Sequence, residues 1–555
     1  MSVGSFVKLA LAVLSLSLVA APARAEWLRA ESEHFIIYGD SSERALRAYS
    51  QKVERFDALL RTYYPVAVDH EIPKLEIFLA DGLKDLRKAS PGISASIGGY
   101  YSPNNGRIYA VTNIASEMKD EVLFHEYAHH FMYQMASSAY PSWFVEGFAE
   151  YYATADITDD RVQFGRHSPG RMNSLTQPVN SWASMENVLT WHVSASGRYR
   201  GSDYYAQAWA MTHYLMSTPE RRAMLRQYLT AVARGAESVE AMQAATGRTA
   251  EQFQNDVRLY LLGSIQMLTP QIQIPVATVT ITRLSPEEAD LIWLDLRLDA
   301  MSPTGDEDED AADDPGEDQS PAAQARRERE ARERIERRGD LIREALAGAA
   351  RHPGGRTAAL VEARAHRLER NPAAGFAVLE PGIAEETVDA ATLRVAAEML
   401  LDQAHGAPDP VEALALRREA RRYLARAMDL APLDFRIYGG LNESRRGERG
   451  YPSDNDISTL EVAVALAPQS FDMRMRLADA YMTRNLPREA AAILQPVAHS
   501  PHGGAWARKG QALLTDAEAA AAQTSAAPAA ETPPPEGDGR TAPAGPASPQ
   551  TPPAG

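Results

Sequence analysis

Two short stretches, "HEYAHH" at residues 125–130 and "PSWFVEGFAEYYA" at residues 141–153, constrain the fold more than any other feature. In the first, His125 and His129 are four residues apart, which places both side chains on one face of a helix, one turn apart. Glu126 can reach a water molecule on a metal ion without being a ligand itself. We therefore predict a helix over about residues 117–136 that carries two metal ligands and a carboxylate general base.

The third ligand of this site is expected in the second stretch. A catalytic zinc site has three protein ligands and an open position for water. The metzincin arrangement would require glycine at position 132 and histidine at position 135, but both positions are methionine. That arrangement is excluded, and the alternative is a glutamate on the following helix, which Glu146 provides.

Two neighbours of Glu146 favour a ligand over a surface carboxylate. Gly147 in the middle of a helix costs about 1 kcal/mol relative to alanine, so it indicates that another backbone comes close, as when this helix crosses the histidine helix. Glu150 lies one turn beyond Glu146 and is predicted to accept a hydrogen bond from the far nitrogen of His125 or His129, as support for the ligand.

An alternative without any metal site remains open for both stretches. The chain contains 13 histidines, and helices with the same histidine spacing occur without any metal. In that interpretation Glu146 and Glu150 are solvated, and the second helix simply buries an apolar stripe of Trp143, Phe144 and Phe148.

"HEYAHH" followed by "PSWFVEGFAEYYA" resembles the gluzincin metallopeptidases, specifically their peptidase MA-like branch. The likeness covers about residues 30–262, with "SEHFIIYGD", "YYAQAWAMTHYL" and "GRTAEQFQNDVRLYL" in the expected order. It implies a thermolysin-like α+β fold whose edge strand lies beside the metal helix. The residues that match the family's zinc ligands are His125, His129 and Glu146, and Glu126 matches its general base.

The resemblance also implies a tyrosine that donates to the oxyanion of the reaction intermediate. "DYYAQAWA" offers Tyr204 or Tyr205, and Tyr205 is favoured by its place in the helix, although either could simply be packed in a helical core. His213 and His130 are expected to be core or surface residues, since His130 projects about 100° around the helix from His129.

The chain departs from the aminopeptidase branch of this family. Its "SIGGYYSPNNGRIYAV" lacks the Gly-x-Met-Glu-Asn stretch that captures a free amino terminus, so exopeptidase activity is unsupported. We hypothesise instead that "RIYAV", residues 107–111, pairs with an extended peptide at the edge of the sheet.

The residues around these stretches predict a small sheet followed by helices. "HFIIYG" (34–39) and "KLEIFLA" (74–80) have strand-like composition and flank an amphipathic helix at 42–64. Asn105-Gly106 predicts a hairpin. The pattern is helical from Tyr204 to about Leu262, and "IPVATVTITRL" (274–284) adds one strand. Residues 26–270 are therefore predicted to form an α+β peptidase MA-like domain.

The first 25 residues predict a secretory signal peptide. Lys8 precedes the apolar run "LALAVLSLSLVA", and "ARA" ending at Ala25 fits a cleavage site, so the mature chain would begin at Glu26 in the periplasm or outside the cell. An uncleaved anchor is the alternative, but about twelve apolar residues are fewer than the roughly twenty that span a bilayer. The net charge of -17 argues against a nucleic-acid or anionic-membrane partner.

Beyond residue 270 the composition changes several times. We expect a connecting strand and helix at 271–300, an acidic and charged disordered linker at 301–339, and a disordered Pro/Ala-rich tail at 516–555. Within the linker, "RREREARERIERR" (326–338) predicts a solvated helix. Residues 340–515 are predicted to form an all-α domain of tetratricopeptide-like repeats, because Leu-Ala-Pro recurs at 430–432 and 466–468 and a degenerate unit ends at Pro501.

These features together predict an exported zinc-dependent metallopeptidase that acts on a peptide or protein substrate, with a protein partner at the C-terminal repeats. The alternative is a periplasmic scaffold whose metallopeptidase-like domain is idle. A zinc hydrolase that acts on a non-peptide bond is a third hypothesis, because the ligands alone do not select the substrate.

Overall fold

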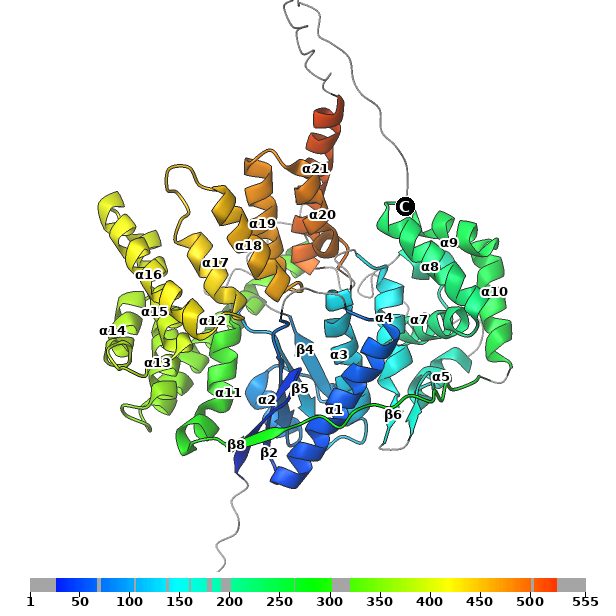
Figure 1. Cartoon of the computed structure of the whole chain (residues 1–555), viewed down its shortest axis with the longest axis horizontal. Coiled ribbons are helices and arrows are strands. Elements are labelled where there is room, and N and C mark those ends of the chain that lie inside the picture. Colours follow the sequence, from blue (N-terminus) through cyan, green and yellow to red (C-terminus); the bar gives the residue numbers. More distant parts are fainter. Residues whose placement is uncertain are drawn as a thin grey trace, which may run out of the picture.

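The computed structural model describes residues 26–66, 71–103, 106–135, 139–158, 161–176, 182–190, 201–263, 265–301, 320–500 and 504–526. The architecture is α+β, with an N-terminal sheet and a large C-terminal region made of helices (Figure 1). The predicted signal peptide at 1–25, the acidic run within 302–319 and the tail beyond 526 lie outside the described residues.

A six-stranded sheet forms the centre of the described N-terminal residues, in the order β4-β5-β3-β2-β1-β8. Strands β2, β3 and β5 are parallel, and the other three pair antiparallel. Helix α1 crosses from β2 to β3, and this confirms the strands expected at 34–39, 74–80 and 274–284 and the helix expected at 42–64. The bounds are β1 (Trp27–Glu31), β2 (Phe35–Asp40), α1 (Glu43–Tyr63), β3 (Leu75–Ala80), β4 (Gly99–Ser102), β5 (Tyr109–Asn113) and β8 (Thr280–Arg283).

The β4–β5 hairpin places β4, and not β5, at the edge of the sheet. The hairpin pairs Gly99 with Thr112 and Ser102 with Tyr109, and Asn105 of its expected turn lies outside the described residues. Strand β5 is bonded to β3 on its other side, so the hypothesis that residues 107–111 form the free edge is wrong. The sequence of a hairpin does not reveal which of its strands joins the existing sheet, and parallel pairing with β3 selects β5.

Helices cover both faces of the sheet. Because side chains alternate along a strand, Ile77 points to the face covered by α1 and α3, whereas Phe78 points to the face covered by α2 and α11. Phe56 of α1 stacks on Phe124 of α3 with ring centres 4.0 Å apart, and Trp293 of α11 meets Trp27 edge-on at 5.4 Å. The bounds are α2 (Leu83–Ala89), α3 (Lys119–Met135) and α11 (Pro286–Ala300).

The remaining N-terminal elements follow α3 and lie to the side of the sheet (Figure 1). Helix α4 packs against both α3 and α7. The helices between Tyr204 and Leu262 confirm the helical pattern expected there. The bounds are α4 (Ser142–Ala153), β6 (Asp156–Ile157), β7 (Val162–Gln163), α5 (Pro169–Thr176), α6 (Met185–Thr190), α7 (Gly201–Met216), α8 (Pro219–Ala233), α9 (Ser238–Thr246) and α10 (Ala250–Leu261).

The C-terminal region is a chain of helices in which each helix from α12 to α21 packs on the next. Both Leu-Ala-Pro motifs end a helix, since α16 and α18 stop at their leucines. The bounds are α12 (Pro321–Ala349), α13 (Arg356–Leu368), α14 (Pro372–Ile383), α15 (Ala390–Gly406), α16 (Pro410–Leu430), α17 (Phe435–Glu443), α18 (Asp454–Leu466), α19 (Phe471–Thr483), α20 (Pro487–Ala498) and α21 (Gly504–Ala526). None of the helices in the described residues is long and apolar enough to cross a bilayer.

Two expectations of disorder are wrong in part. Residues 321–339 of the expected linker belong to α12, in agreement with the solvated helix expected at 326–338. Its charges lie at helical spacing, as in the Arg326–Glu330 and Arg329–Glu333 pairs. Residues 516–526 of the expected tail belong to α21, because Leu514 and Ala517 are buried against α20.

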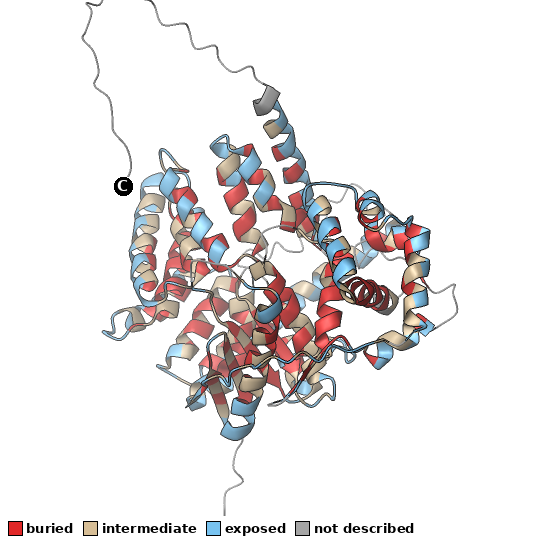
Figure 2. Ribbon diagram, turned by 45° about the vertical axis from the view of Figure 1, so that its right-hand side comes forward, coloured by how far each residue is buried: buried red, intermediate tan, exposed pale blue. Residues whose placement is uncertain are grey.

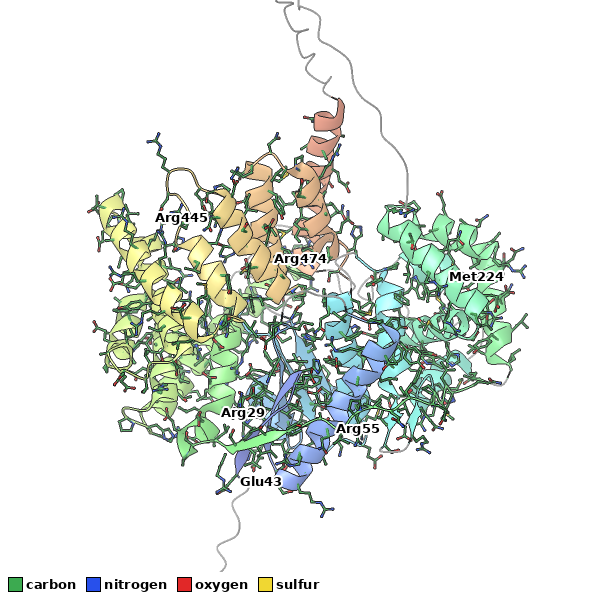
Figure 3. All side chains as sticks on the ribbon, in the orientation of Figure 1. Arg29, Glu43, Arg55, Met224, Arg445 and Arg474 are labelled. Atoms are coloured by element: carbon green, nitrogen blue, oxygen red, sulfur yellow. The ribbon has the colours of Figure 1, made fainter. Side chains whose placement is uncertain are left out.

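The C-terminal helices contact the N-terminal domain directly. Ile108, just before β5, packs into the apolar cluster of Phe435 and Met473, and Arg436 donates to the backbone carbonyl of Gly106 at 3.0 Å. Arg474 of α19 is 1% exposed and lies on the side of the helical region that faces α3 (Figure 3). Figure 2 shows that buried residues continue from the sheet into these helices. The two regions therefore form one packed body.

Candidate metal centre

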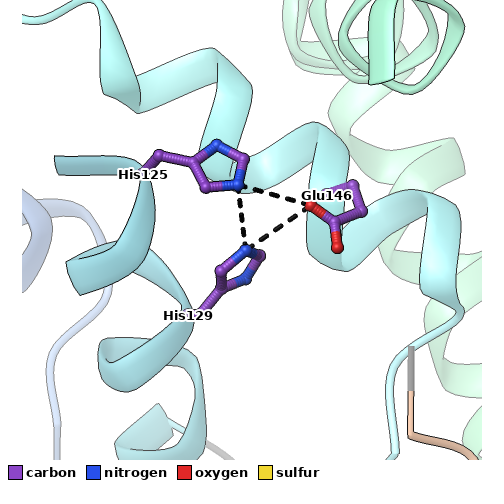
Figure 4. A group of neighbouring side chains, drawn as sticks. All are labelled: His125, His129 and Glu146. Carbon is purple, nitrogen blue, oxygen red and sulfur yellow. Dashed lines mark hydrogen bonds and ion pairs between the residues drawn. The ribbon is translucent and has the colours of Figure 1, made fainter. Parts of the chain in front are cut away.

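Helix α3 places His125 and His129 side by side, one turn apart, facing α4 (Figure 4). Their Nε2 atoms are 3.1 Å apart. Two neutral imidazole nitrogens at this separation both present lone pairs when their protons are on Nδ1, which is how two histidines share a cation.

Glu146 completes a triangle of donor atoms. It lies on α4 with no exposed surface, and its Oε2 atom is 3.4 Å from Nε2 of His125 and 3.5 Å from Nε2 of His129. Ligand atoms around a tetrahedral ion with bonds of about 2.0–2.1 Å are about 3.3–3.4 Å from one another. The sides of this triangle are close to that spacing, and two imidazoles with one carboxylate are a zinc donor set, so the residues present fit a zinc ion.

The charges around His125 suit a cation. Burial disfavours its protonation, but hydrogen bonds and charges from Glu146 and Glu150 outweigh burial and hold its pKa well above the usual value. Burial likewise opposes ionisation of Glu146, and the charges and hydrogen bonds of the two histidines reverse this and lower its pKa. The pocket therefore stabilises positive charge at the histidines, and a divalent cation can supply that charge in place of a proton.

Glu150 supports His125, and not His129. Its Oε1 atom is 3.3 Å from Nδ1 of His125, on the opposite side of the ring from Glu146. Burial raises the pKa of Glu150, but hydrogen bonds with His125 and Arg171 and their charges lower it to about 2. An ionised carboxylate here accepts a hydrogen bond from the Nδ1–H group and so leaves the Nε2 lone pair of His125 for a metal.

Glu126 is part of α3, and its carboxylate lies near the edge strand β4. The backbone of Tyr101, on β4, lies close enough to this carboxylate to lower its pKa. Burial raises the pKa of Glu126. The charges of His125 and His129 lower it and the charge of Glu146 raises it, and the resulting pKa is above the usual value for a glutamate. A carboxylate whose pKa is shifted towards neutrality is suited to accept and return a proton.

Tyr204 and Tyr205 have different surroundings. Tyr204 is 1% exposed, among core side chains. The Tyr205 ring is 6.0 Å from the His125 ring and is partly exposed. Burial, then the charges of Glu146 and Glu126, raise the pKa of Tyr205, so its phenol keeps its proton and can act as a donor. Of the two tyrosines, Tyr205 is therefore the one whose ring lies beside that of His125.

The profile of a family described as "Protein of unknown function (DUF1570)" matches residues 121–236. That stretch contains every residue predicted for the site. No curated protein matches the chain. The family description states no activity.

Arg171 belongs to the site but was missed in the sequence. It lies on α5, where its Nε and Nη2 atoms donate to the two carboxylate oxygens of Glu150 at 2.9 and 2.6 Å. Its guanidinium carbon is also 4.8 Å from the centre of the Tyr205 ring. No motif surrounds Arg171, and the helix that carries it is short, so no signal in the sequence distinguishes it from the other arginines.

His130 and His213 are core residues, as one of the two expected alternatives had it. Nδ1 of His130 is 2.9 Å from the Tyr101 hydroxyl, and Nδ1 of His213 is 2.8 Å from the Tyr260 hydroxyl. Burial lowers the pKa of His130 to about 3, with a further contribution from Arg61, and lowers that of His213 to about 4. Both rings are therefore neutral at physiological pH.

A second group of histidine and carboxylates lies in the described residues, at His34, Glu54 and Asp57. Its oxygens are already occupied by protein donors. Asp57 accepts two hydrogen bonds from Nε of Arg61 at 2.7 and 2.9 Å and one from the Tyr127 hydroxyl at 2.5 Å, and Glu54 accepts from the backbone and ring of His34. Because Arg61 supplies the positive charge, this group is a structural network that joins β2, α1 and α3.

Gly147 is needed because α7 approaches α4. A Cβ atom added at Gly147 would lie 2.5 Å from the carbonyl oxygen of Ala208 on α7. The expected close approach of a backbone is therefore present, but the neighbour is α7 and not the histidine helix, so that detail of the prediction is wrong. The sequence does not identify which helix comes close, since a glycine indicates only that a neighbouring group leaves no room for a Cβ atom.

We expect Gly147→Ala to destabilise the fold by about 1–3 kcal/mol, because α4 must move away from α7 to accommodate the methyl group. Chemical denaturation of the two proteins measures the difference. Gly170→Ala is the control, since a Cβ there meets nothing within 4 Å, and it should cost nothing. Equal stability of Gly147→Ala and the parent would show that α4 and α7 are not packed this closely.

Proposed function

We propose that the chain is an exported zinc-dependent metallopeptidase of the gluzincin type, with a thermolysin-like catalytic domain. The observation that carries the proposal is the triangle of His125, His129 and Glu146 donor atoms, with sides of 3.1, 3.4 and 3.5 Å, next to the half-buried Glu126 on the same helix as the two histidines. Export rests on the signal expected at residues 1–25.

His125, His129 and Glu146 would hold the zinc ion. When bound, zinc supplies a Lewis acid that lowers the pKa of water and polarises a carbonyl group. Glu150 keeps His125 in the tautomer that presents Nε2, through the contact with Nδ1.

Glu126 is the group that moves protons. Its carboxylate would accept a proton from the attacking water and return it to the amine that leaves, and its raised pKa favours the first of these transfers. Tyr205 would donate its phenol proton in a hydrogen bond to the oxygen on which negative charge develops. Both roles use side chains that lie next to His125.

The edge strand β4 supplies a place for an extended peptide. In the described residues its hydrogen-bonded neighbour is β5, and the backbone of Tyr101 on β4 lies close to Glu126. A peptide added along β4 would pass the proposed base, with backbone hydrogen bonds holding it. The peptide would then pair with residues 99–102 instead of 107–111.

The C-terminal helices are proposed to bind a protein partner as tetratricopeptide-like repeats do. A groove of about 480 Å³ lies between these helices and the residues around Gly106 and Asp299, and its lining includes Arg446, Arg476 and Trp506. Stacked helices commonly present such concave surfaces to partners.

Glu126→Gln is expected to lower kcat for peptide hydrolysis by about 10²–10⁴-fold, because the amide cannot take the proton from water. Zinc content should stay at that of the parent, since Glu126 is not among the three donors. The measurement is kcat on a denatured protein or casein-derived peptide mixture, with zinc quantified in the same samples.

Glu117→Gln, at an exposed position just before α3, is the matched control and should leave kcat unchanged. Full activity in Glu126→Gln would sink the proposed mechanism. A parent that binds zinc but cleaves no peptide in the mixture would instead favour a non-peptide substrate.

A further inference from the structure

We propose that Arg171 is a positioning residue that holds Glu150 against His125 and, at the same time, holds the ring of Tyr205 beside the metal centre. The inference rests on the proposed function, because it assigns the role of one more side chain in that same site. Arg171 touches none of the three donor atoms and is therefore not a catalytic residue.

The first half of the inference rests on the fork between Arg171 and Glu150. Nε donates to Oε2 at 2.9 Å and Nη2 donates to Oε1 at 2.6 Å, which is the bidentate geometry that fixes a carboxylate in one plane. Oε1 is also the atom that lies 3.3 Å from Nδ1 of His125. The orientation of the His125 ring is therefore determined by Glu150, and the orientation of Glu150 by Arg171.

The second half rests on the stacking of Arg171 on Tyr205. The guanidinium carbon lies 4.8 Å from the centre of the ring, a distance at which the cation is attracted to the face of the ring. The same ring is 6.0 Å from the His125 ring. One side chain thus connects α4, which carries Glu150, with α7, which carries Tyr205.

Charge gives a further reason for an arginine here. Three carboxylates, those of Glu126, Glu146 and Glu150, lie around the two histidines. Glu150 is 5% exposed, and a carboxylate that is buried to this extent is expected to have a paired counter-ion. Arg171 supplies that counter-ion while 27% of its own side chain stays exposed to solvent.

The first experiment measures zinc affinity by competition with a chromogenic chelator, for the parent, Arg171→Gln and Arg171→Lys. Loss of an outer support of a metal ligand typically weakens binding about 10–100-fold, and we expect this for Arg171→Gln. Arg171→Lys keeps the positive charge but cannot make the two parallel hydrogen bonds to Glu150. Its zinc affinity should therefore lie between those of the parent and Arg171→Gln. Arg166→Gln, at a nearby exposed position, should bind zinc like the parent.

An unchanged zinc affinity in Arg171→Gln would overturn the link through Glu150. This measurement needs no substrate, so it still decides the inference if the parent binds zinc but hydrolyses no peptide and the proposed function fails. If Arg171→Gln does not fold by circular dichroism, Arg171→Lys gives the deciding comparison with the parent.

The second experiment is a double-mutant cycle with Tyr205→Phe. If Arg171 positions Tyr205, then Arg171→Gln should lower kcat by a larger factor in the parent than in Tyr205→Phe, with KM little changed in both. Equal factors in the two backgrounds would overturn the link to Tyr205. When no peptide is cleaved, the same cycle is measured on the melting temperature instead of kcat. Arg171→Gln should then lower the melting temperature by less in Tyr205→Phe than in the parent.

Discussion

Glu146→Ala is expected to lose its zinc on dialysis against a weak chelator, whereas the parent keeps one ion per chain. Glu146 is fully buried and supplies the only oxygen of the three donors that converge in the described residues. Its removal leaves two histidines on α3, and a site with two protein ligands has no third atom to complete the geometry that zinc prefers. Hydrolysis should fall to the background rate together with the metal.

The size of this effect follows from the strength of protein zinc sites. About 10–16 kcal/mol for four ligands corresponds to about 2.5–4 kcal/mol for each, or roughly 10²–10³-fold in affinity. Inductively coupled plasma analysis and chelator competition measure it. Glu240→Ala, at an exposed position of α9, is the control. Zinc retained at parent affinity in Glu146→Ala would remove Glu146 from the ligand set.

Asp299→Ala is expected to lower the free energy of unfolding by about 3–5 kcal/mol, the second large effect. Asp299 ends α11, and its carboxylate is 8% exposed. Oδ1 accepts hydrogen bonds from Arg364 at 2.8 Å and Arg394 at 3.0 Å, and Oδ2 accepts one from Arg436 at 2.8 Å and lies 3.8 Å from Arg107. Without the carboxylate, four guanidinium groups remain close together with less negative charge to balance them.

Denaturant unfolding, followed by circular dichroism, measures the loss. Asp290→Ala is the matched control, because Asp290 lies on the same helix and also pairs with an arginine and a histidine, but its side chain is 44% exposed. An exposed pair contributes about 0–1 kcal/mol, so this variant should unfold nearly like the parent. Equal losses of unfolding free energy in the two variants would mean that the contacts of Asp299 with the four arginines do not hold the C-terminal helices on the sheet.

The parts of the fold that depend on neighbouring residues could be predicted from the sequence. Alternation in "HFIIYG" and helical spacing in residues 42–64 determine β2 and α1, because each element buries one face. The spacing of His125 and His129 likewise places both on one side of α3, and Glu146 follows on the next helix. For these residues the structure brings together the side chains that the pattern had selected.

Contacts between distant segments could not be predicted in this way. Asp299 meets arginines that are 65, 95 and 137 positions away, and no local period relates them. Arg171 reaches Glu150 from 21 positions away for the same reason. The choice of β4 as the edge strand also depends on a long-range pairing, that of β5 with β3.

Because α11 covers one face of the sheet, it determines which residues must be kept together when this domain is transferred to another protein. Ile292, Trp293 and Leu296 of this helix bury the face that carries Phe78 and Val111, and β8 pairs along β1. A fragment that ends at residue 270 would expose that apolar face and an unpaired strand, and such surfaces promote aggregation. In recombination between genes, the segment from 271 to 300 must therefore be kept together with the sheet and the candidate metal centre. A break beyond residue 300 is the earliest that leaves the sheet covered.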